Sequence, residues 1–188
     1  MTVSCYSVRA RQLKLISMAV FVTLVMSGCS QAPPPDALRE GSLFPPLALK
    51  GFDGNVVAVD SFRGRFVVLN VWATWCAPCR RELPSLERLS RLIDPQRFVV
   101  AGLSVDSDIL QAQEYLIDKG ITFASYIDPD GKIATGILGI RIYPDTLLIS
   151  RQGILLRTIA GERVWDDPAV IKALNEAYEG RYELLAGL

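Results

Sequence analysis

Two kinds of hydrophobic pattern divide the region from residue 43 to residue 180 into strands and helices. Continuous apolar runs at Phe66–Trp72 and Phe98–Val105 predict strands that are buried on both faces. Leucines at helical spacing predict a helix from about Cys76 to Ile93. Strands that alternate with helices in this way are typical of an α/β domain with a central mixed sheet and helices on both faces.

Shorter segments fit the same plan. Leu47–Lys50 and Val56–Val59 flank an Asp-Gly turn and predict an N-terminal β-hairpin. A helix is predicted over 108–119, closed by Gly120 as the residue just past its end. The remaining predictions are a strand at 123–127, a short helix at 132–138, a hairpin of strands at 146–150 and 154–160, and a final helix from Asp167 to Tyr178.

The N-terminal residues have the order of a secretory signal peptide. Arg9, Arg11 and Lys14 precede an apolar run at 15–25, and small residues follow. The junction Met26-Ser27-Gly28-Cys29 resembles a bacterial lipobox, in which the cysteine is acylated and becomes the mature N-terminus. An ordinary signal peptide with a chance cysteine and an uncleaved anchor are the alternatives. The predicted domains are therefore a lipoprotein signal peptide (1–28), a proline-rich tether (29–42), a folded domain (43–180) and a C-terminal tail (181–188).

Charge and cysteine content narrow the functional classes. The chain has 20 basic and 20 acidic side chains, and its three basic signal residues would be removed, which leaves a mature net charge of −3. No basic cluster favours nucleic-acid binding. Of the four cysteines, Cys5 would leave with the signal and Cys29 would carry lipid. Cys76 and Cys79 would then be the only thiols of the mature chain.

The spacing of Cys76 and Cys79, between a predicted buried strand and a predicted helix, indicates a thiol–disulfide redox site. A cysteine at a helix N-terminus is more readily ionised, because free N–H groups and the helix dipole favour negative charge there. The second cysteine lies one turn on, where it can attack a mixed disulfide. A zinc site would need three or four protein ligands. The chain has no histidine and no second such pair, so we expect no metal and no cofactor.

The string Asn70–Pro84 resembles the active-site sequence of TlpA/ResA-like membrane-anchored thioredoxin-fold oxidoreductases, which are related to the AhpC/TSA and redoxin proteins. The DsbE/CcmG branch of cytochrome c maturation proteins is close by, because Pro144 is followed by an acid and a threonine. The resemblance implies a thioredoxin-like fold with an N-terminal β-hairpin and a central insertion at about 106–140. Asn70 stands where ordinary thioredoxin has a buried aspartate.

The resemblance also implies roles for individual residues. Cys76 would be the nucleophile and Cys79 the resolving thiol. Trp75 would shield the pair, and Pro144 would be a cis-proline that shapes the substrate groove. Glu82 would match a glutamate near the dithiol; the alternative is an exposed helix glutamate that the dipole favours anyway.

Together these features predict an extracytoplasmic thiol–disulfide oxidoreductase that reduces protein disulfides. It would be lipid-anchored in the bacterial cell envelope, facing the periplasm or the outer side of the cytoplasmic membrane. The resemblance implies a membrane reductase of the DsbD or CcdA type as electron donor. One alternative is a DsbE/CcmG-like reductant dedicated to apocytochrome c. An alternative of another class is a copper metallochaperone, but Sco-type carriers use a wider C-x-x-x-C and a histidine, and this chain has neither.

Overall fold

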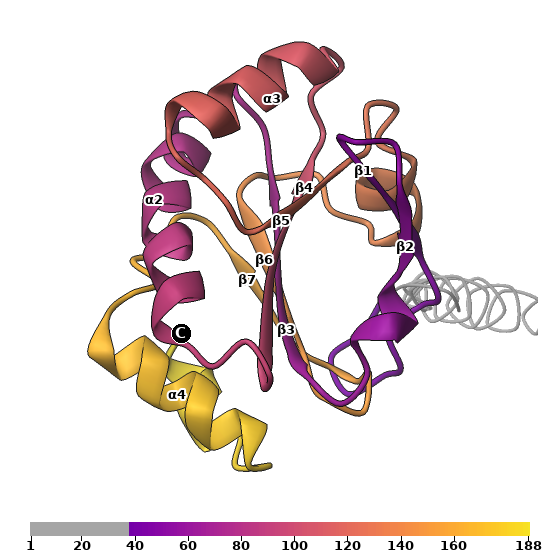
Figure 1. The fold of residues 1–188 in the computed structure, drawn as a ribbon. Helices are drawn as coiled ribbons and strands as arrows, with labels where there is room; N and C mark the ends of the chain where they lie inside the picture. The colour runs from indigo at the N-terminus through magenta and orange to yellow at the C-terminus, as the bar shows by residue number, and fades with distance from the viewer. Residues whose placement is uncertain (1–37) are drawn as a thin grey trace, which may run out of the picture. The chain divides into compact units, whose positions relative to one another are not determined.

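The computed structural model describes residues 38–188. The predicted signal peptide, Cys29 and the predicted tether up to residue 37 lie outside the described residues. Within the described part, the strands form one seven-stranded mixed sheet in the order β2-β1-β5-β4-β3-β6-β7 (Figure 1). The strands are β1 (Ala48–Gly51), β2 (Val56–Ala58), β3 (Phe66–Trp72), β4 (Phe98–Ser104), β5 (Ala124–Ile127), β6 (Asp145–Ile149) and β7 (Leu155–Ala160).

The α-helices of residues 38–188 are α2 (Ala77–Leu92), α3 (Ile109–Asp118) and α4 (Pro168–Tyr178). Two short 3₁₀ helices, η1 (Val59–Phe62) and η3 (Glu183–Gly187), and a π-helical turn, η2 (Lys132–Ile137), complete the structure. None of the helices in this part of the chain combines the length and apolar character needed to cross a bilayer. In the C-terminal segment 181–188, Leu185 of η3 is buried against the core.

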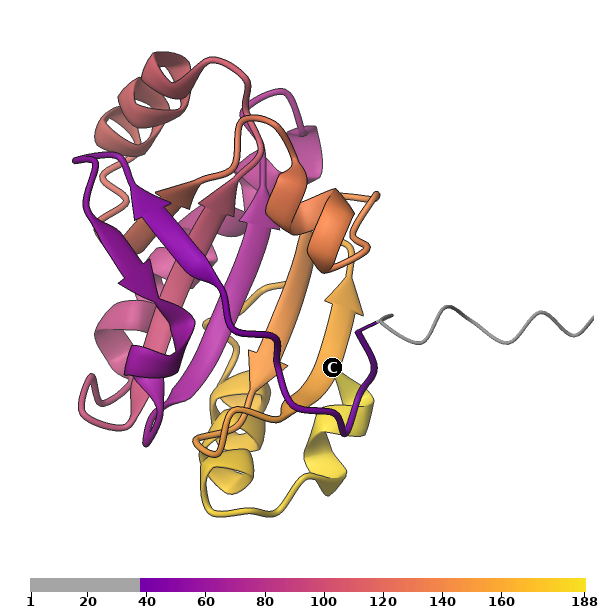
Figure 2. The same ribbon diagram turned by 90° about the vertical axis from the view of Figure 1, so that its right-hand side faces the viewer.

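The helices are distributed unequally over the two faces. Side chains of α2, α3 and α4 pack with Phe66 and Val68 of β3 in one core cluster, and the alternate residues Val67 and Leu69 belong to a second cluster. This second face, toward the viewer in Figure 2, is covered by η1, η2 and the N-terminal segment. Helices were predicted on both faces of the sheet. One face is covered by the three α-helices, and the other by the short helical turns η1 and η2.

The strand order explains this distribution. β3, β4 and β5 are parallel neighbours that follow one another across the sheet. Parallel crossovers are nearly always right-handed, so two crossovers in the same direction place their helices on the same face. α2 and α3 are these crossover helices, and buried side chains of both belong to the same core cluster; α2 lies to the left of the sheet in Figure 1.

Local patterns predicted most elements closely. β3 occupies the residues of the predicted buried strand, and all seven are buried. The predicted N-terminal hairpin forms by antiparallel pairing of β1 and β2, with Gly54 at φ +83° in its turn. Gly120 follows α3 at φ +62°, as expected of a residue that ends a helix in the left-handed conformation. The short helix predicted at 132–138 is the π-helical turn η2.

The register of the strands brings the candidate functional residues together at one end of the sheet, where β3 ends and β6 begins. β3 ends at Trp72 and leads directly into the loop before α2. β6 runs antiparallel to β3, with Asp145 paired to Val71, so the start of β6 lies beside the end of β3. The segment that contains Pro144 therefore lies next to the loop that contains Cys76.

Candidate active site

The two cysteines occupy the N-terminus of α2 and are joined in a disulfide with an S–S distance of 2.07 Å. Cys76 is the N-cap residue, and its Sγ accepts a hydrogen bond from the backbone N–H of Cys79 at 3.2 Å. Cys76 is 6% exposed and Cys79 is fully buried. Of the two cysteines, only Cys76 therefore keeps any contact with solvent.

Asp106 holds the loop that precedes the cysteines. The backbone N–H of Thr74 donates to both carboxylate oxygens of Asp106 at 3.0 Å, and its hydroxyl donates to Oδ1 at 2.6 Å. Ser104, at the end of β4, donates its hydroxyl to Oδ2 at 2.8 Å. Sequence reasoning missed this residue. Its position just after a buried parallel strand was the available signal, because the carboxyl ends of β3 and β4 meet at one edge.

Aromatic side chains extend from both loops of the site. Trp75 is 64% exposed, and its ring lies edge-on to that of Tyr143 with centroids 5.7 Å apart. The peptide bond between Tyr143 and Pro144 is cis. The exposed Trp75 therefore connects the cysteine loop with the cis-proline loop.

Glu82 lies one turn after Cys79 on α2 and is only 1% exposed. The alternative of an exposed helix glutamate is therefore wrong. Its Oε1 accepts a hydrogen bond from the indole N–H of Trp165. Its Oε2 has no hydrogen-bond partner among residues 38–188. Burial raises the pKa of Glu82 to about 7, although the Trp165 hydrogen bond opposes this rise.

A second buried carboxyl lies at the start of β6. Asp145 is 8% exposed, and burial raises its pKa to about 6, against a lowering hydrogen bond from the backbone of Thr146. The negative charge of Asp145 also contributes to the raised pKa of Glu82. The site thus contains two carboxyl groups that keep their protons to an unusually high pH.

Asn70 lies on β3 and is fully buried. Its Nδ2 donates to the Thr146 hydroxyl at 2.9 Å, and its Oδ1 has no partner in the described part of the chain. A neutral amide does not exchange a proton near pH 7. Among the buried side chains described here, the carboxyl groups of Glu82 and Asp145 are therefore the candidates for proton transfer.

The basic residues of the first turns of α2 face outward. Arg81 is exposed and forms an ion pair with Glu162 at 2.6 Å. Arg80 is exposed, and its backbone carbonyl accepts a hydrogen bond from the Tyr115 hydroxyl at 3.3 Å. No group of three or more His, Cys, Asp or Glu side chains within residues 38–188 is placed to hold a metal ion.

Comparison with known proteins agrees with this geometry. The chain is 29% identical to thiol-disulfide oxidoreductase ResA of Geobacillus thermodenitrificans over 131 residues, which cover 70% of this chain and 75% of that protein. It is 31% identical to the thioredoxin-like protein YneN of Bacillus subtilis over 120 residues, 63% of this chain and 69% of that protein.

Among solved structures, a putative thiol:disulfide interchange protein DsbE from Chlorobium tepidum matches with a TM-score of 0.66 and 29% identity. The match covers 78% of this chain and 99% of that one. The predicted thioredoxin-like fold is therefore confirmed. Residues 41–158 match the AhpC/TSA family. With this match over more than half of its length, the chain belongs to the AhpC/TSA family.

Proposed function

We propose that this protein is an extracytoplasmic thiol–disulfide oxidoreductase that reduces the disulfides of other proteins. The observation that carries the proposal is the Cys76–Cys79 disulfide at the N-terminus of α2, in which Cys76 keeps a small exposed fraction and Cys79 is fully buried. Disulfide exchange needs an accessible thiolate that attacks and a second thiol that resolves the mixed disulfide. The names of the relatives, thiol-disulfide oxidoreductase among them, support the same activity.

The reaction starts from the reduced dithiol. The Cys76 thiolate attacks one sulfur of a substrate disulfide, forms a mixed disulfide and expels the other substrate sulfur as a thiolate. Cys79 then attacks Sγ of Cys76, which restores the Cys76–Cys79 disulfide and releases the second substrate thiolate. Two electrons pass to the substrate, and the two protons of the dithiol end on the two substrate thiols.

Glu82 is proposed to carry one of these protons. It lies on the same helix as the cysteines, one turn after Cys79, and burial brings its pKa to about 7. A carboxyl with this pKa can both accept and release a proton at neutral pH. When ionised, it also opposes a thiolate nearby, because two negative charges in a buried site repel each other.

Trp75 and Pro144 are proposed to form the walls that receive the substrate. Trp75 is exposed beside Cys76 and contacts Tyr143, which precedes the cis-proline. Proline has no N–H, so the backbone before it stays available for an extended substrate segment. Exposed aromatic surface beside an accessible sulfur suits a protein substrate better than a small thiol.

The direction of electron flow follows from how weakly the site stabilises a thiolate. A dithiol that strongly stabilises its thiolate favours the reduced form and acts as an oxidant. Here Pro78 removes one backbone N–H near the pair, the chain has no histidine, and Glu82 adds negative charge. We therefore propose a reductant.

A reductant outside the cytoplasm needs a supply of electrons. We propose a membrane reductase of the DsbD or CcdA type as its donor. We also propose that Cys29 carries lipid and that residues 29–42 tether the domain to the bacterial membrane, at the periplasmic or outer side. The signal-like order of residues 1–28 supports this location.

A narrower version assigns the protein to reduction of apocytochrome c before haem attachment. Its support is the buried acid directly after the cis-proline, Asp145, at the place where the DsbE branch has glutamate. The likeness to the structure of the putative thiol:disulfide interchange protein DsbE from Chlorobium tepidum also favours it.

Insulin reduction tests the activity. The full chain in detergent, reduced with dithiothreitol, should accelerate insulin reduction, and Cys76→Ser should not. Titration of the reduced protein with Cu(I) provides the comparison. Tight stoichiometric copper binding without any insulin reduction would favour a metallochaperone. Partners trapped on Cys79→Ala in cells would then separate apocytochromes from other substrates.

A further inference from the structure

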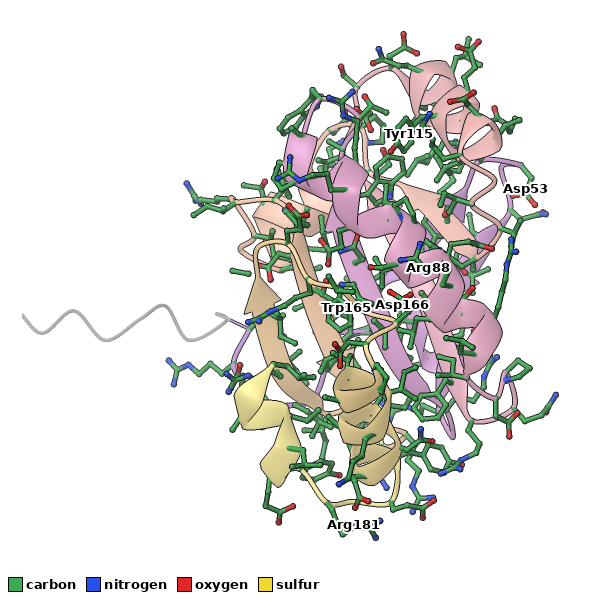
Figure 3. The ribbon with its side chains drawn as sticks, turned by 90° about the vertical axis from the view of Figure 1, so that its left-hand side faces the viewer. Asp53, Arg88, Tyr115, Trp165, Asp166 and Arg181 are labelled. Atoms are coloured by element: carbon green, nitrogen blue, oxygen red, sulfur yellow. A yellow bond between two sulfur atoms is a disulfide. The ribbon has the colours of Figure 1, made fainter. Side chains whose placement is uncertain are left out.

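The segment Glu162–Asp166, between β7 and α4, is bound to one side of α2 by two ion pairs. Glu162 forms an ion pair with Arg81 at 2.6 Å, and Asp166 forms one with Arg88 at 2.6 Å. Figure 3 shows Asp166 next to Arg88 on α2, with Trp165 beside it. The two arginines lie seven residues apart and so share one face of the helix. The segment is therefore held at both ends.

Between these ion pairs, Ser85 fixes the middle of the segment. Its hydroxyl accepts from the backbone N–H of Trp165 at 3.0 Å, and its proton is shared between the carbonyls of Glu82 at 2.8 Å and Arg163 at 3.3 Å. Ser85 is 4% exposed, so these bonds are shielded from water. The backbone of Trp165 thus has a defined position relative to α2.

The side chain of Trp165 points into the protein. It is 1% exposed and belongs to the core cluster that also contains Cys79 and Leu83. Its indole N–H donates to Oε1 of Glu82. Among residues 38–188 this is the sole hydrogen bond that the Glu82 carboxyl receives, since Oε2 has no partner. A buried indole N–H needs an acceptor and a buried carboxyl needs donors, so this bond satisfies the indole and one of the two carboxyl oxygens.

We propose that Trp165 is a positioning residue for the dithiol chemistry: its indole N–H, held by the 162–166 segment, fixes and partly stabilises the carboxylate of Glu82 in the second turn of α2. The proposal rests on the proton-transfer role proposed for Glu82. Trp165 is buried, so its place in the proposal is to position Glu82 and not to bind the substrate. Its contribution is exerted through Glu82 alone.

The charges around Glu82 predict the direction of the effect. Burial raises the pKa of Glu82 to about 7, the Trp165 hydrogen bond lowers it, Glu162 and Asp145 raise it, and Arg163 lowers it. A phenylalanine at position 165 would keep most of the apolar enclosure and remove the donor. The ionised carboxylate would lose its hydrogen bond and stay buried, so the pKa of Glu82 should rise further.

The test follows the titration of Glu82 in the oxidised full chain in detergent, where Cys76 and Cys79 are joined in a disulfide and do not titrate. The ¹³C resonance of the Glu82 carboxyl is assigned by its loss in Glu82→Gln. Trp165→Phe should move its midpoint to higher pH. Trp72→Phe is the matched control, because it removes a buried indole whose N–H has no acceptor in the described residues. This control should leave the midpoint in place.

A second measurement needs no change at Trp165. The ¹H–¹⁵N resonance of its indole should titrate with the same midpoint as the Glu82 carboxyl, and this titration should vanish in Glu82→Gln. If Trp165→Phe does not fold, this titration of the Trp165 indole alone tests whether the indole is coupled to Glu82. An indole resonance that does not titrate, an unmoved Glu82 midpoint in Trp165→Phe, or equal shifts in both tryptophan variants would overturn the proposal.

The link to the thiols is tested by the pH profile of Cys76 alkylation in the reduced protein. Trp165→Phe should shift this profile, and the shift should disappear when Glu82→Gln is also present. A shift that persists in the double variant would mean that Trp165 does not act through Glu82. The carboxyl titration does not depend on reductase activity, so its failure is distinguishable from a failure of insulin reduction.

Discussion

The Glu82→Gln substitution should change how the stability of the oxidised protein depends on pH. Burial raises the pKa of Glu82 from its usual 4.5 to about 7. In the unfolded chain the group ionises near 4.5, but in the folded protein it keeps its proton until about 7. Between these values the folded state binds more protons, so the free energy of unfolding falls as pH rises. At about 1.36 kcal/mol per pKa unit, the loss is about 3 kcal/mol.

Glutamine removes this pH dependence with little change of shape. Its side-chain oxygen can still accept the Trp165 hydrogen bond, and it carries no charge at any pH. The free energy of unfolding of the variant, relative to wild type, should therefore increase by about 3 kcal/mol between pH 4.5 and pH 7.5. Asp145 also has a raised pKa, but it is present in both proteins, so the difference between them isolates Glu82.

Urea unfolding with the disulfide intact, at several pH values between 4.5 and 8, measures this difference. Glu87 on the same helix is the control. It is 6% exposed, and burial raises its pKa, but hydrogen bonds from Thr122, Arg91 and Phe123 outweigh burial and hold the pKa below its usual value. Its stabilisation is present above pH 4.5 and is lost in acid, so Glu87→Gln should be destabilised at neutral pH. Parallel curves for Glu82→Gln and wild type would refute the reasoning.

Four further outcomes are expected. Cys76→Ser should abolish disulfide exchange and Cys79→Ser should accumulate mixed disulfides, because only the resolving thiol expels the partner; first alkylation at Cys79 in the reduced protein would reverse the roles. Glu82→Gln should lower the alkylation pKa of Cys76, since it removes a nearby negative charge, and an unchanged profile would argue against the coupling. Cys29→Ser should release the protein from membranes with its redox chemistry intact, and firm retention would indicate an uncleaved helix. Equilibration with glutathione should give a potential of about −250 mV or below, and a value near that of DsbA would make the protein an oxidant.

The elements that sequence reasoning placed well are those whose signals are local. The run Phe66–Trp72 is apolar at nearly every position, and a strand covered on both faces needs this pattern. Asp167 and Pro168 fix the start of α4, because the aspartate accepts from the N–H of Ala169 and proline suits the first turn. In such segments the residues that decide the structure lie within a few positions of one another.

The parts that were missed depend on residues far apart in the chain. The hydrogen-bond donor to the buried Glu82 carboxyl is Trp165, which lies 83 residues later. Asp106 reaches back 32 residues to Thr74. The unequal distribution of helices follows from the order of β3, β4 and β5 in the sheet, which no local pattern records. Helical spacing gives the face of α2 on which Glu82 lies, but not what packs against that face.

The cysteine motif and its surroundings act on the thiolate in opposite directions. As the N-cap of α2, Cys76 is placed where the helix dipole and the N–H of Cys79 stabilise negative charge on its sulfur. In the proposed mechanism Glu82, once ionised, disfavours that charge, and its pKa of about 7 would place the change at neutral pH. The Cys-x-x-Cys spacing alone therefore does not determine the redox potential. Under the role proposed for Glu82, the redox potential also depends on how readily this buried carboxyl ionises. It then depends on the segment, distant in sequence, that supplies the indole of Trp165.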